Sequence, residues 1–264
     1  MSKLIKEIIA LVRLRKSGAQ ICRTIVFNLR MLPFREAIHL PFILYGKVLY
    51  NECTPYESGG GIRRASKERL KFNSWQIGYP VYHLEATNIA TKLIIKGNLI
   101  VGERGRIYTG SCIIVQPNAK SQLGTGFSIC TYSRLICYND IMIGENVVVS
   151  WECQIYDTNF HYTSDVNGEV KKKDGRVAIG NNVWVANRSS LTKDSVIPSD
   201  SIVASNSLVN KDYSQNPSGL YAGIPAKLLK PSCRAEFTLE GILNHYFVIN
   251  PNECSVNIKN IYKA

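Results

Sequence analysis

A six-residue period constrains this chain more than any other feature. From Val177 the sequence reads VAIGNN VWVANR SSLTKD SVIPSD SIVASN SLVNKD. The third column of this alignment is aliphatic throughout, and the first column is small or β-branched. The third-column residues are Ile179, Val185, Leu191, Ile197, Val203 and Val209. Six consecutive aliphatic residues in one phase would arise by chance about once in 4,000, so the period indicates a repeated structure.

A period of six does not match the 3.6 residues of a surface helix, but it is a multiple of the two-residue period of a strand. Short parallel strands that alternate with turns satisfy it, because they form the sides of a coil with one aliphatic residue per side pointing to the axis. The phase extends backwards to Ile95 and is continuous to Ile155. We therefore expect a β-helical rod that begins near residue 89.

The segment 156–176 interrupts the period. Its phase positions are His161, Asn167 and Lys173, and none of these residues belongs on an apolar axis. The segment must leave the rod as a loop before the phase resumes at Ile179. Loops that project from a rigid scaffold are common sites of function, although the basic triplet 171–173 can also be read as a solvated turn.

Composition limits the remaining classes. The chain has 264 residues and a formal charge of +12, but it shows no nucleic-acid motif, so a phosphate-rich small molecule accounts for the charge more economically. The eight cysteines form no CxxC pair, which favours buried free thiols over disulfides or a metal cluster. Four histidines that are scattered along the chain do not supply the three ligands of a β-helix metal site, so no metal is expected.

The N-terminal 88 residues are expected to form a mixed region of helix and strand. Residues 3–16 are too short and too charged to span a membrane, and they fit a basic amphipathic helix. Such a helix either packs against the rod or a neighbouring subunit, or docks at the inner face of a membrane. The run from Pro41 to Tyr45 is typical of a strand. We expect a cytoplasmic protein, associated with the inner membrane face if the helix docks.

Three motifs resemble the hexapeptide-repeat (left-handed parallel β-helix) acyltransferases, and specifically the branch that acetylates sugars and surface polysaccharides. They are IGENVVVSWECQIYDTNFH at 143–161, IGNNVWVAN at 179–187 and AGIPAK at 222–227. The resemblance implies an all-β fold, with a left-handed β-helix over 89–230. It leaves 1–88 as the N-terminal mixed region and 231–264 as a C-terminal cap. A short helix is expected within residues 232–247.

The resemblance also implies the chemistry. His161 matches the catalytic base of an acetyl-CoA-dependent O-acetyltransferase, and direct attack by a sugar hydroxyl requires such a group. Asp157 either orients the imidazole or forms a turn. The oxyanion of the intermediate needs donors, but the coil that supplies them in relatives is not plainly matched here. Weak candidates for this substrate-binding role are Ser133, Arg134 and Asn139.

Acetyl-CoA is expected to lie along the outside of the rod, where small or polar corner residues leave room for a pantetheine arm. An outward-facing indole, Trp184, suits a wall of this cleft or a subunit contact. The outward position of Trp184 and the small or polar corner residues Ala186, Asn187, Ala204 and Ser205 suit this contact. The resemblance implies that CoA is also bound at Asn187, Ser205, Asn210, Lys211, Lys227 and Lys230. Cationic side chains at the end of the rod suit the nucleotide phosphates. The resemblance further implies a homotrimer with each site between two subunits.

Two other functions remain open at this stage. An N-acetyltransferase acting on an amino sugar would use the same machinery. A non-catalytic β-helix scaffold would keep the fold without the chemistry, although His161 in its loop and the AGIPAK motif argue against this alternative.

Overall fold

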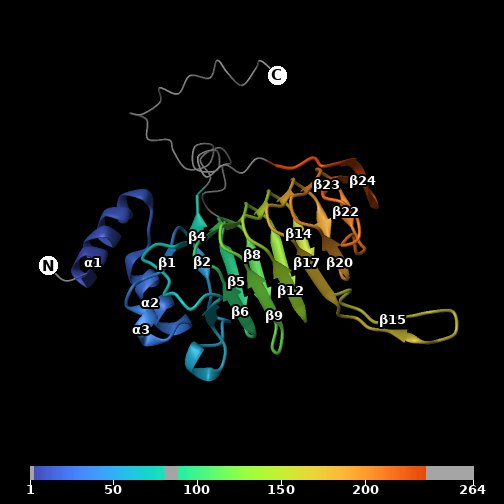
Figure 1. Cartoon of the computed structure of the whole chain (residues 1–264). Coiled ribbons are helices and arrows are strands. Elements are labelled where there is room, and N and C mark those ends of the chain that lie inside the picture. Colours follow the sequence, from blue (N-terminus) through green and yellow to red (C-terminus); the bar gives the residue numbers. More distant parts are fainter. Residues whose placement is uncertain (1–2, 81–88, 236–264) are drawn as a thin grey trace, which may run out of the picture.

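The structure is a computed structural model that describes residues 3–80 and 89–235. Its main body is a three-sided prism of short strands, with helices gathered at its N-terminal end and a ribbon projecting from one corner (Figure 1). Successive strands pass from one side of the prism to the next, and equivalent strands of successive coils pair in parallel. This is the coil of parallel strands that the six-residue period predicts, and it is the left-handed β-helix that the family resemblance implies.

Three sheets form the sides of the prism. The first contains β1 (Phe42–Leu44), β4 (Trp75–Tyr79), β7 (Gly105–Tyr108), β10 (Phe127–Ile129), β13 (Val148–Val149), β18 (Trp184–Val185), β21 (Ile202–Val203), β23 (Gly219–Gly223) and β24 (Ala226–Pro231). The second contains β2 (Val48–Leu49), β5 (Thr91–Ile95), β8 (Cys112–Val115), β11 (Arg134–Cys137), β14 (Gln154–Tyr156), β19 (Ser190–Leu191) and β22 (Leu208–Val209). The third contains β3 (Ile62–Arg64), β6 (Asn98–Val101), β9 (Lys120–Leu123), β12 (Asp140–Ile143), β17 (Arg176–Ile179) and β20 (Ser195–Ile197).

The register explains the sequence period. Paired residues such as Val185 and Val203 lie 18 positions apart, which is one coil of three six-residue sides. All six aliphatic residues of the third column are buried on the prism axis, and so are the first-column residues from Val177 to Ser207. The described cysteines are free, as predicted, and the predicted burial holds for Cys53, Cys130, Cys137 and Cys153. Cys22 is exposed, and Cys112 and Cys233 are half-buried.

The corners explain why asparagine and aspartate recur in the repeat. Asn146, Asn182, Asp200 and Asn206 have φ values between 52° and 56°, in the left-handed region that these two residue types enter more readily than most. Three of them also stack along one corner: the Asn146 amide donates to Asn182, and the Asn182 amide donates to Asp200. This corner therefore turns the chain and ties one coil to the next.

The prism begins earlier than predicted. Strands β1, β2 and β3 form the N-terminal edge of the three sheets, and β4 opens the next coil, so the boundary expected at 88/89 does not separate two structures. The strand expected at 41–45 is confirmed as β1. Its coil was hidden in the sequence because irregular loops replace the six-residue spacing between β2, β3 and β4. These loops include η2 (Tyr56–Ser58).

The helices cover the N-terminal end of the prism. They are α1 (Lys3–Leu14), η1 (Arg15–Ser17), α2 (Ile21–Met31) and α3 (Phe34–Ala37). On α2, Phe27 and Met31 are buried in the core, while the side-chain amide of Asn28 donates to the Phe42 carbonyl and its oxygen accepts from the Phe42 N–H. Helix α2 thus satisfies polar groups of the first strand, which would otherwise be an open sheet edge.

Helix α1 confirms the amphipathic helix expected in residues 3–16. Its buried side packs Leu11 into a separate cluster with Ile43 and Tyr45 of the first strand region. Within the described residues, no helix is long and apolar enough to cross a membrane. The C-terminal helix expected within 232–247 falls almost wholly outside the described residues.

Candidate functional site

The interruption of the repeat is an antiparallel ribbon, which we call the arm (residues 157–175). It leaves the prism after β14, at the corner between the second and third sheets (Figure 1). Thr158 bridges Asp174 at its base, and β15 (Thr163–Ser164) pairs with β16 (Val170–Lys171) further out. The prediction that 156–176 leaves the rod is confirmed, because the register resumes with Ile143 beside Ile179.

Asp157 fixes the base of the arm. One carboxylate oxygen accepts the backbone N–H of Tyr138 at 2.7 Å, and the other accepts those of Asn139 and Asp140 at 2.8 and 2.7 Å. The Cys137 thiol lies 3.5 Å from the second oxygen. Burial raises the pKa of the Asp157 carboxyl, and the backbone N–H donors act in the opposite direction.

Of the two roles expected for Asp157, orienting the imidazole or forming a turn, these contacts fit the second. Its hydrogen bonds go to backbone groups of the preceding coil, and a bond from the His161 ring is not among them. The physical reason is that the turn from Cys137 to Asp140 presents three inward N–H groups that need an acceptor. Asp157 therefore holds the exit of the arm in place instead of holding the imidazole.

His161 lies just beyond this base and is exposed. Its backbone N–H donates to the Asn159 carbonyl at 2.7 Å, in a tight turn where Phe160 has a φ of 61°. Across the described residues, its imidazole has no hydrogen-bond or ion-pair partner. The ring is thus available to a molecule outside this chain.

Aromatic rings support the turn that carries His161. The Phe160 ring lies 5.8 Å from that of Tyr138 and 6.0 Å from that of Tyr156. The ammonium of Lys173 lies 5.3 Å from the Tyr138 ring and 5.6 Å from the Tyr162 ring, within cation–π range. Both strands of the arm are therefore packed together where they leave the prism.

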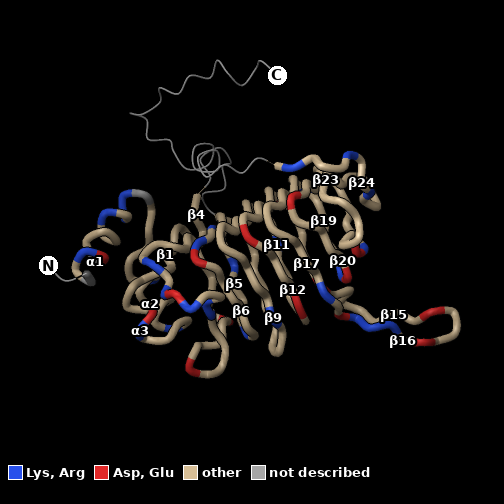
Figure 2. Tube along the Cα trace, in the orientation of Figure 1, with Lys and Arg blue, Asp and Glu red and all other residues tan. Residues whose placement is uncertain are grey.

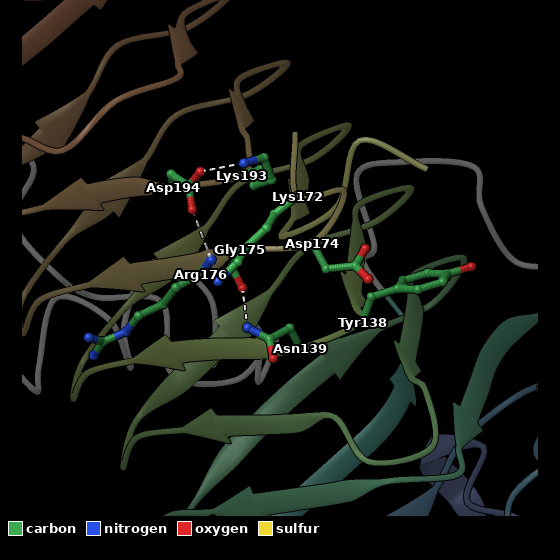
Figure 3. Close-up of a pocket in the computed structure, with 8 residues that line it drawn as sticks. All are labelled: Tyr138, Asn139, Lys172, Asp174, Gly175, Arg176, Lys193 and Asp194. Atoms are coloured by element: carbon green, nitrogen blue, oxygen red, sulfur yellow. Dashed lines mark hydrogen bonds and ion pairs between the residues drawn. The ribbon is translucent and has the colours of Figure 1, made fainter. Parts of the chain in front are cut away.

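A polar pocket of about 430 Å³ lies at the same corner (Figure 3). Its lining residues are Tyr138, Asn139, Lys172, Asp174, Gly175, Arg176, Lys193 and Asp194. Inside it, the Asn139 amide donates to the Gly175 carbonyl at 2.6 Å, and the Lys193 ammonium lies 2.5 Å from Asp194. The pocket is lined by charged and polar side chains from both sides of the arm's base.

Of the three weak oxyanion candidates, only Asn139 lines this pocket. Arg134 is exposed at the start of β11. Ser133 is fully buried: its hydroxyl donates to the Ser150 carbonyl at 2.7 Å and accepts the N–H of Cys153. The prediction for Ser133 is wrong, because this position is the small inward residue of a corner.

Five of the residues expected to contact acetyl-CoA lie together at the corner between the first and second sheets. Trp184 is 39% exposed, as its outward phase predicts, and its indole N–H donates to the Ser150 hydroxyl at 2.9 Å. In the next coils the Ser205 hydroxyl donates to the Asn187 side chain at 2.7 Å. Ala204 is half-buried between them.

Ala186 differs from the expectation of an outward-facing residue. It is only 5% exposed. Its backbone N–H donates to the Val203 carbonyl, and its own carbonyl accepts from the Cys153 thiol. Ala186 therefore shapes the corner and presents little surface of its own.

The other four expected contacts lie elsewhere on the chain. Asn210 and Lys211 follow β22 and lie at the corner from which the arm leaves, where the Lys211 ammonium is 5.3 Å from the Tyr213 ring. Lys227 and Lys230 are exposed on β24, which pairs antiparallel with β23 at the C-terminal end of the first sheet. Within one copy of the chain, the residues expected to contact acetyl-CoA thus lie at two different corners of the prism and on β24.

Sequence reasoning missed the residues that line the pocket with Asn139. Arg176 and Asp194 are far from Asn139 in sequence, but Asp140 pairs with Arg176 in the ladder, and the N–H of Arg176 donates to Asp194. An alignment of the six-residue repeats before and after residues 157–175 in one register would have placed Asp140, Arg176 and Asp194 in neighbouring coils.

The fold and this corner define a class: a hexapeptide-repeat β-helix with an exposed histidine on a projecting arm. No family model matches the chain. An uncharacterized 24.8 kDa protein in the cps region of Klebsiella pneumoniae is 38% identical over 137 residues. That match covers 49% of this chain and 60% of the Klebsiella protein.

Three solved structures are similar to this chain at low identity. The polysialic acid O-acetyltransferase OatWY is 21% identical, with 78% of this chain and 85% of that chain covered and a TM-score of 0.35. AntD, an N-acyltransferase from Bacillus cereus, is 14% identical, with 78% and 87% covered and a TM-score of 0.42. A hexapeptide-repeat acetyltransferase from Vibrio cholerae, complexed with acetyl coenzyme A, is 15% identical, with 80% and 84% covered and a TM-score of 0.34.

Proposed function

We propose that this protein is an acetyl-CoA-dependent O-acetyltransferase acting on a sugar hydroxyl of a surface polysaccharide or its precursor. The observation that carries the proposal is the placement of His161. The arm lifts this residue out of a rigid prism, its ring has no partner among the described residues, and a polar pocket lies at the same corner. The cps-region relative supports a glycan acceptor.

In this mechanism His161 acts as the general base. Its imidazole removes the proton of the sugar hydroxyl while the hydroxyl oxygen attacks the thioester carbonyl. The carbon–sulfur bond then breaks, and the imidazolium returns the proton to the departing thiolate. No covalent intermediate on the protein is needed. Such a base contributes roughly 10²- to 10⁴-fold to the rate, and positioning of both substrates supplies a further large share.

Asn139 and Arg134 remain the candidates that stabilise the oxyanion or hold the acceptor. The Asn139 amide donates to the Gly175 carbonyl and lies at the corner from which the arm leaves. The Arg134 side chain is exposed one strand away on β11. Both are charged or polar donors, which the developing negative charge requires.

The donor half of the site requires a second copy of the chain. His161 belongs to the corner between the second and third sheets, whereas Trp184, Asn187 and Ser205 belong to the corner between the first and second. A cyclic homotrimer brings one corner of each subunit against a different corner of its neighbour. The pantetheine arm would then lie along the neighbour's small-residue corner, with its phosphates near Lys227 and Lys230.

The decisive experiment compares His161→Ala with the wild-type protein. Release of free thiol from acetyl-CoA is measured with candidate glycans, and CoA binding is measured by calorimetry. We expect binding to be retained and turnover to fall by about 10²- to 10⁴-fold. Thr163→Ala, an exposed change on the same arm, is the matched control and should keep full turnover. Equal turnover of His161→Ala and wild type would place the base elsewhere.

Two alternatives are tested by the same assays. Amino-sugar acceptors that release thiol faster than their hydroxyl counterparts would make the protein an N-acetyltransferase. Failure to bind CoA in calorimetry would leave a non-catalytic scaffold.

A further inference from the structure

The N-terminal helices expose an unusual amount of apolar surface. Seven large apolar side chains within residues 5–34 are exposed to solvent. They are Ile5, Ile9 and Val12 of α1, Ile25, Val26 and Leu29 of α2, and Phe34 at the start of α3. We call these seven residues the helical surface. They contribute neither to the core of the prism nor to the candidate site.

On each helix the exposed apolar residues form a stripe opposite the buried one. In α1, Ile5, Ile9 and Val12 follow the spacing i, i+4, i+7, which places them on one face. The face that packs on the first sheet contains Leu11, which is 1% exposed. The helix therefore has apolar residues on two faces. Packing within the chain buries only the face that contains Leu11.

Helix α2 repeats this arrangement. Phe27 and Met31 fill the end of the core, whereas Ile25 and Leu29 point to solvent on the other face, with Val26 beside them. Phe34, which follows α2, is 70% exposed. A water-facing helix normally carries polar residues on this side, so the exposed stripe needs a partner.

The charges beside the helical surface indicate the chemistry of that partner. Residues 3–35 contain eight Lys or Arg residues and one acidic residue, Glu7 (Figure 2). Glu7 is buried and lies 3.4 Å from His39. Five of the cations are exposed, namely Lys6, Arg13, Arg15, Lys16 and Arg35. An apolar stripe flanked by exposed cations is the pattern of a helix that lies in the interface of an anionic bilayer.

A two-fold contact with a second copy of the chain fits this surface less well. A symmetric self-contact places the same patch on both sides, so it would bring these cations together without acidic side chains to neutralise them. Charged residues are also depleted at the centre of protein interfaces. Phosphate headgroups with acyl chains below them satisfy both the cations and the apolar stripe.

We infer that the helical surface docks the protein on anionic phospholipid, with the apolar side chains of α1 and α2 inserted at the headgroup boundary. The inference does not depend on the proposed catalysis. It assigns α2 and Phe34 a role that the sequence pattern of residues 3–16 alone did not indicate.

Co-sedimentation of the full chain with lipid vesicles tests this. We expect binding to vesicles of phosphatidylcholine mixed with phosphatidylglycerol, and little binding to phosphatidylcholine alone. The double variants Ile9→Glu/Val12→Glu and Ile25→Glu/Leu29→Glu should each weaken the binding at least about tenfold, because they remove apolar contact and add repulsive charge. Raising the salt concentration should weaken wild-type binding as well, since it screens the phosphate attraction.

The matched control is Ile224→Glu/Leu229→Glu, which makes the same chemical change at exposed positions of the β23–β24 hairpin, at the other end of the prism. It should bind vesicles like the wild type. Circular dichroism and thermal unfolding verify that each variant is folded. The inference is overturned if the wild type ignores anionic vesicles, or if either helical variant still binds them like the wild type. It is also overturned if those variants change the oligomeric state and leave vesicle binding intact, because the surface would then be an interface between copies.

Discussion

Replacement of Asp157 by asparagine separates a structural role for this residue from a catalytic one. The asparagine side chain keeps the shape of aspartate and one acceptor oxygen, which can still receive the N–H of Tyr138. Its NH₂ group takes the place of the second oxygen, where the backbone N–H groups of Asn139 and Asp140 converge at 2.8 and 2.7 Å. Donors then face donors at a buried position.

The magnitude follows from these contacts. Two hydrogen bonds to a charged acceptor are lost, each contributing roughly 1.5–3 kcal/mol. Part of this loss is offset because the burial that raises the pKa of Asp157 shows that the carboxylate itself is costly to bury. We expect a net destabilisation of about 3 kcal/mol, or a fall of about 6–12 °C in Tm for a chain of this size.

Thermal and urea unfolding measure this effect. The matched control is Asp174→Asn at the base of the same arm, where a partly exposed carboxylate accepts from a single hydroxyl, that of Thr158, at 2.5 Å. We expect that change to cost less than about 1 kcal/mol. If Asp157→Asn unfolds like the wild type while turnover falls, binding the backbone N–H groups of residues 138–140 is not the main role of this carboxylate. Orientation of His161 would then be its role.

Two further changes test the core. Gly105→Ala places a methyl group against the ring of fully buried Trp75; it should cost about 1–3 kcal/mol of overpacking, and an unchanged Tm would contradict the packing of this coil. Burial raises the pKa of Cys130 to about 12 and of Cys153 to about 11, so both thiols stay protonated at pH 8. Iodoacetamide followed by peptide mapping should label exposed Cys22 and spare both core thiols in the folded protein, and rapid labelling of either would refute their placement.

The repeat can be recognised in the sequence because the position of a residue within its six-residue side decides whether its side chain points inward. A residue at the third position points inward whatever its neighbours in other coils are, so Ile179, Val185 and their equivalents could be assigned without a structure. The same logic located the exit of the chain, since His161 and Lys173 occupy inward phases that an apolar axis does not accept. Local phase also placed Trp184 outward and Cys137 and Cys153 inward.

Phase alone could not predict the first coil. Between β2, β3 and β4 the connecting loops break the six-residue spacing, and only the pairing of β1 with β4 and of β3 with β6 shows that these strands belong to the prism. The amide of Asn28 reaches Phe42 from another element, a contact that no periodicity in either segment encodes.

The candidate site shows the same division. The sequence determined that a histidine leaves the rod on a loop, because the third position of the repeat points to an apolar axis that does not accept an imidazole. Only the tertiary structure decided what surrounds it: the buried acceptor Asp157, the inward Ser133, and the separation of His161 from the corner of Trp184. These properties depend on hydrogen bonds and stacking between coils. The residues that meet there are a whole coil apart, or further where the arm intervenes, so no local pattern records their contact.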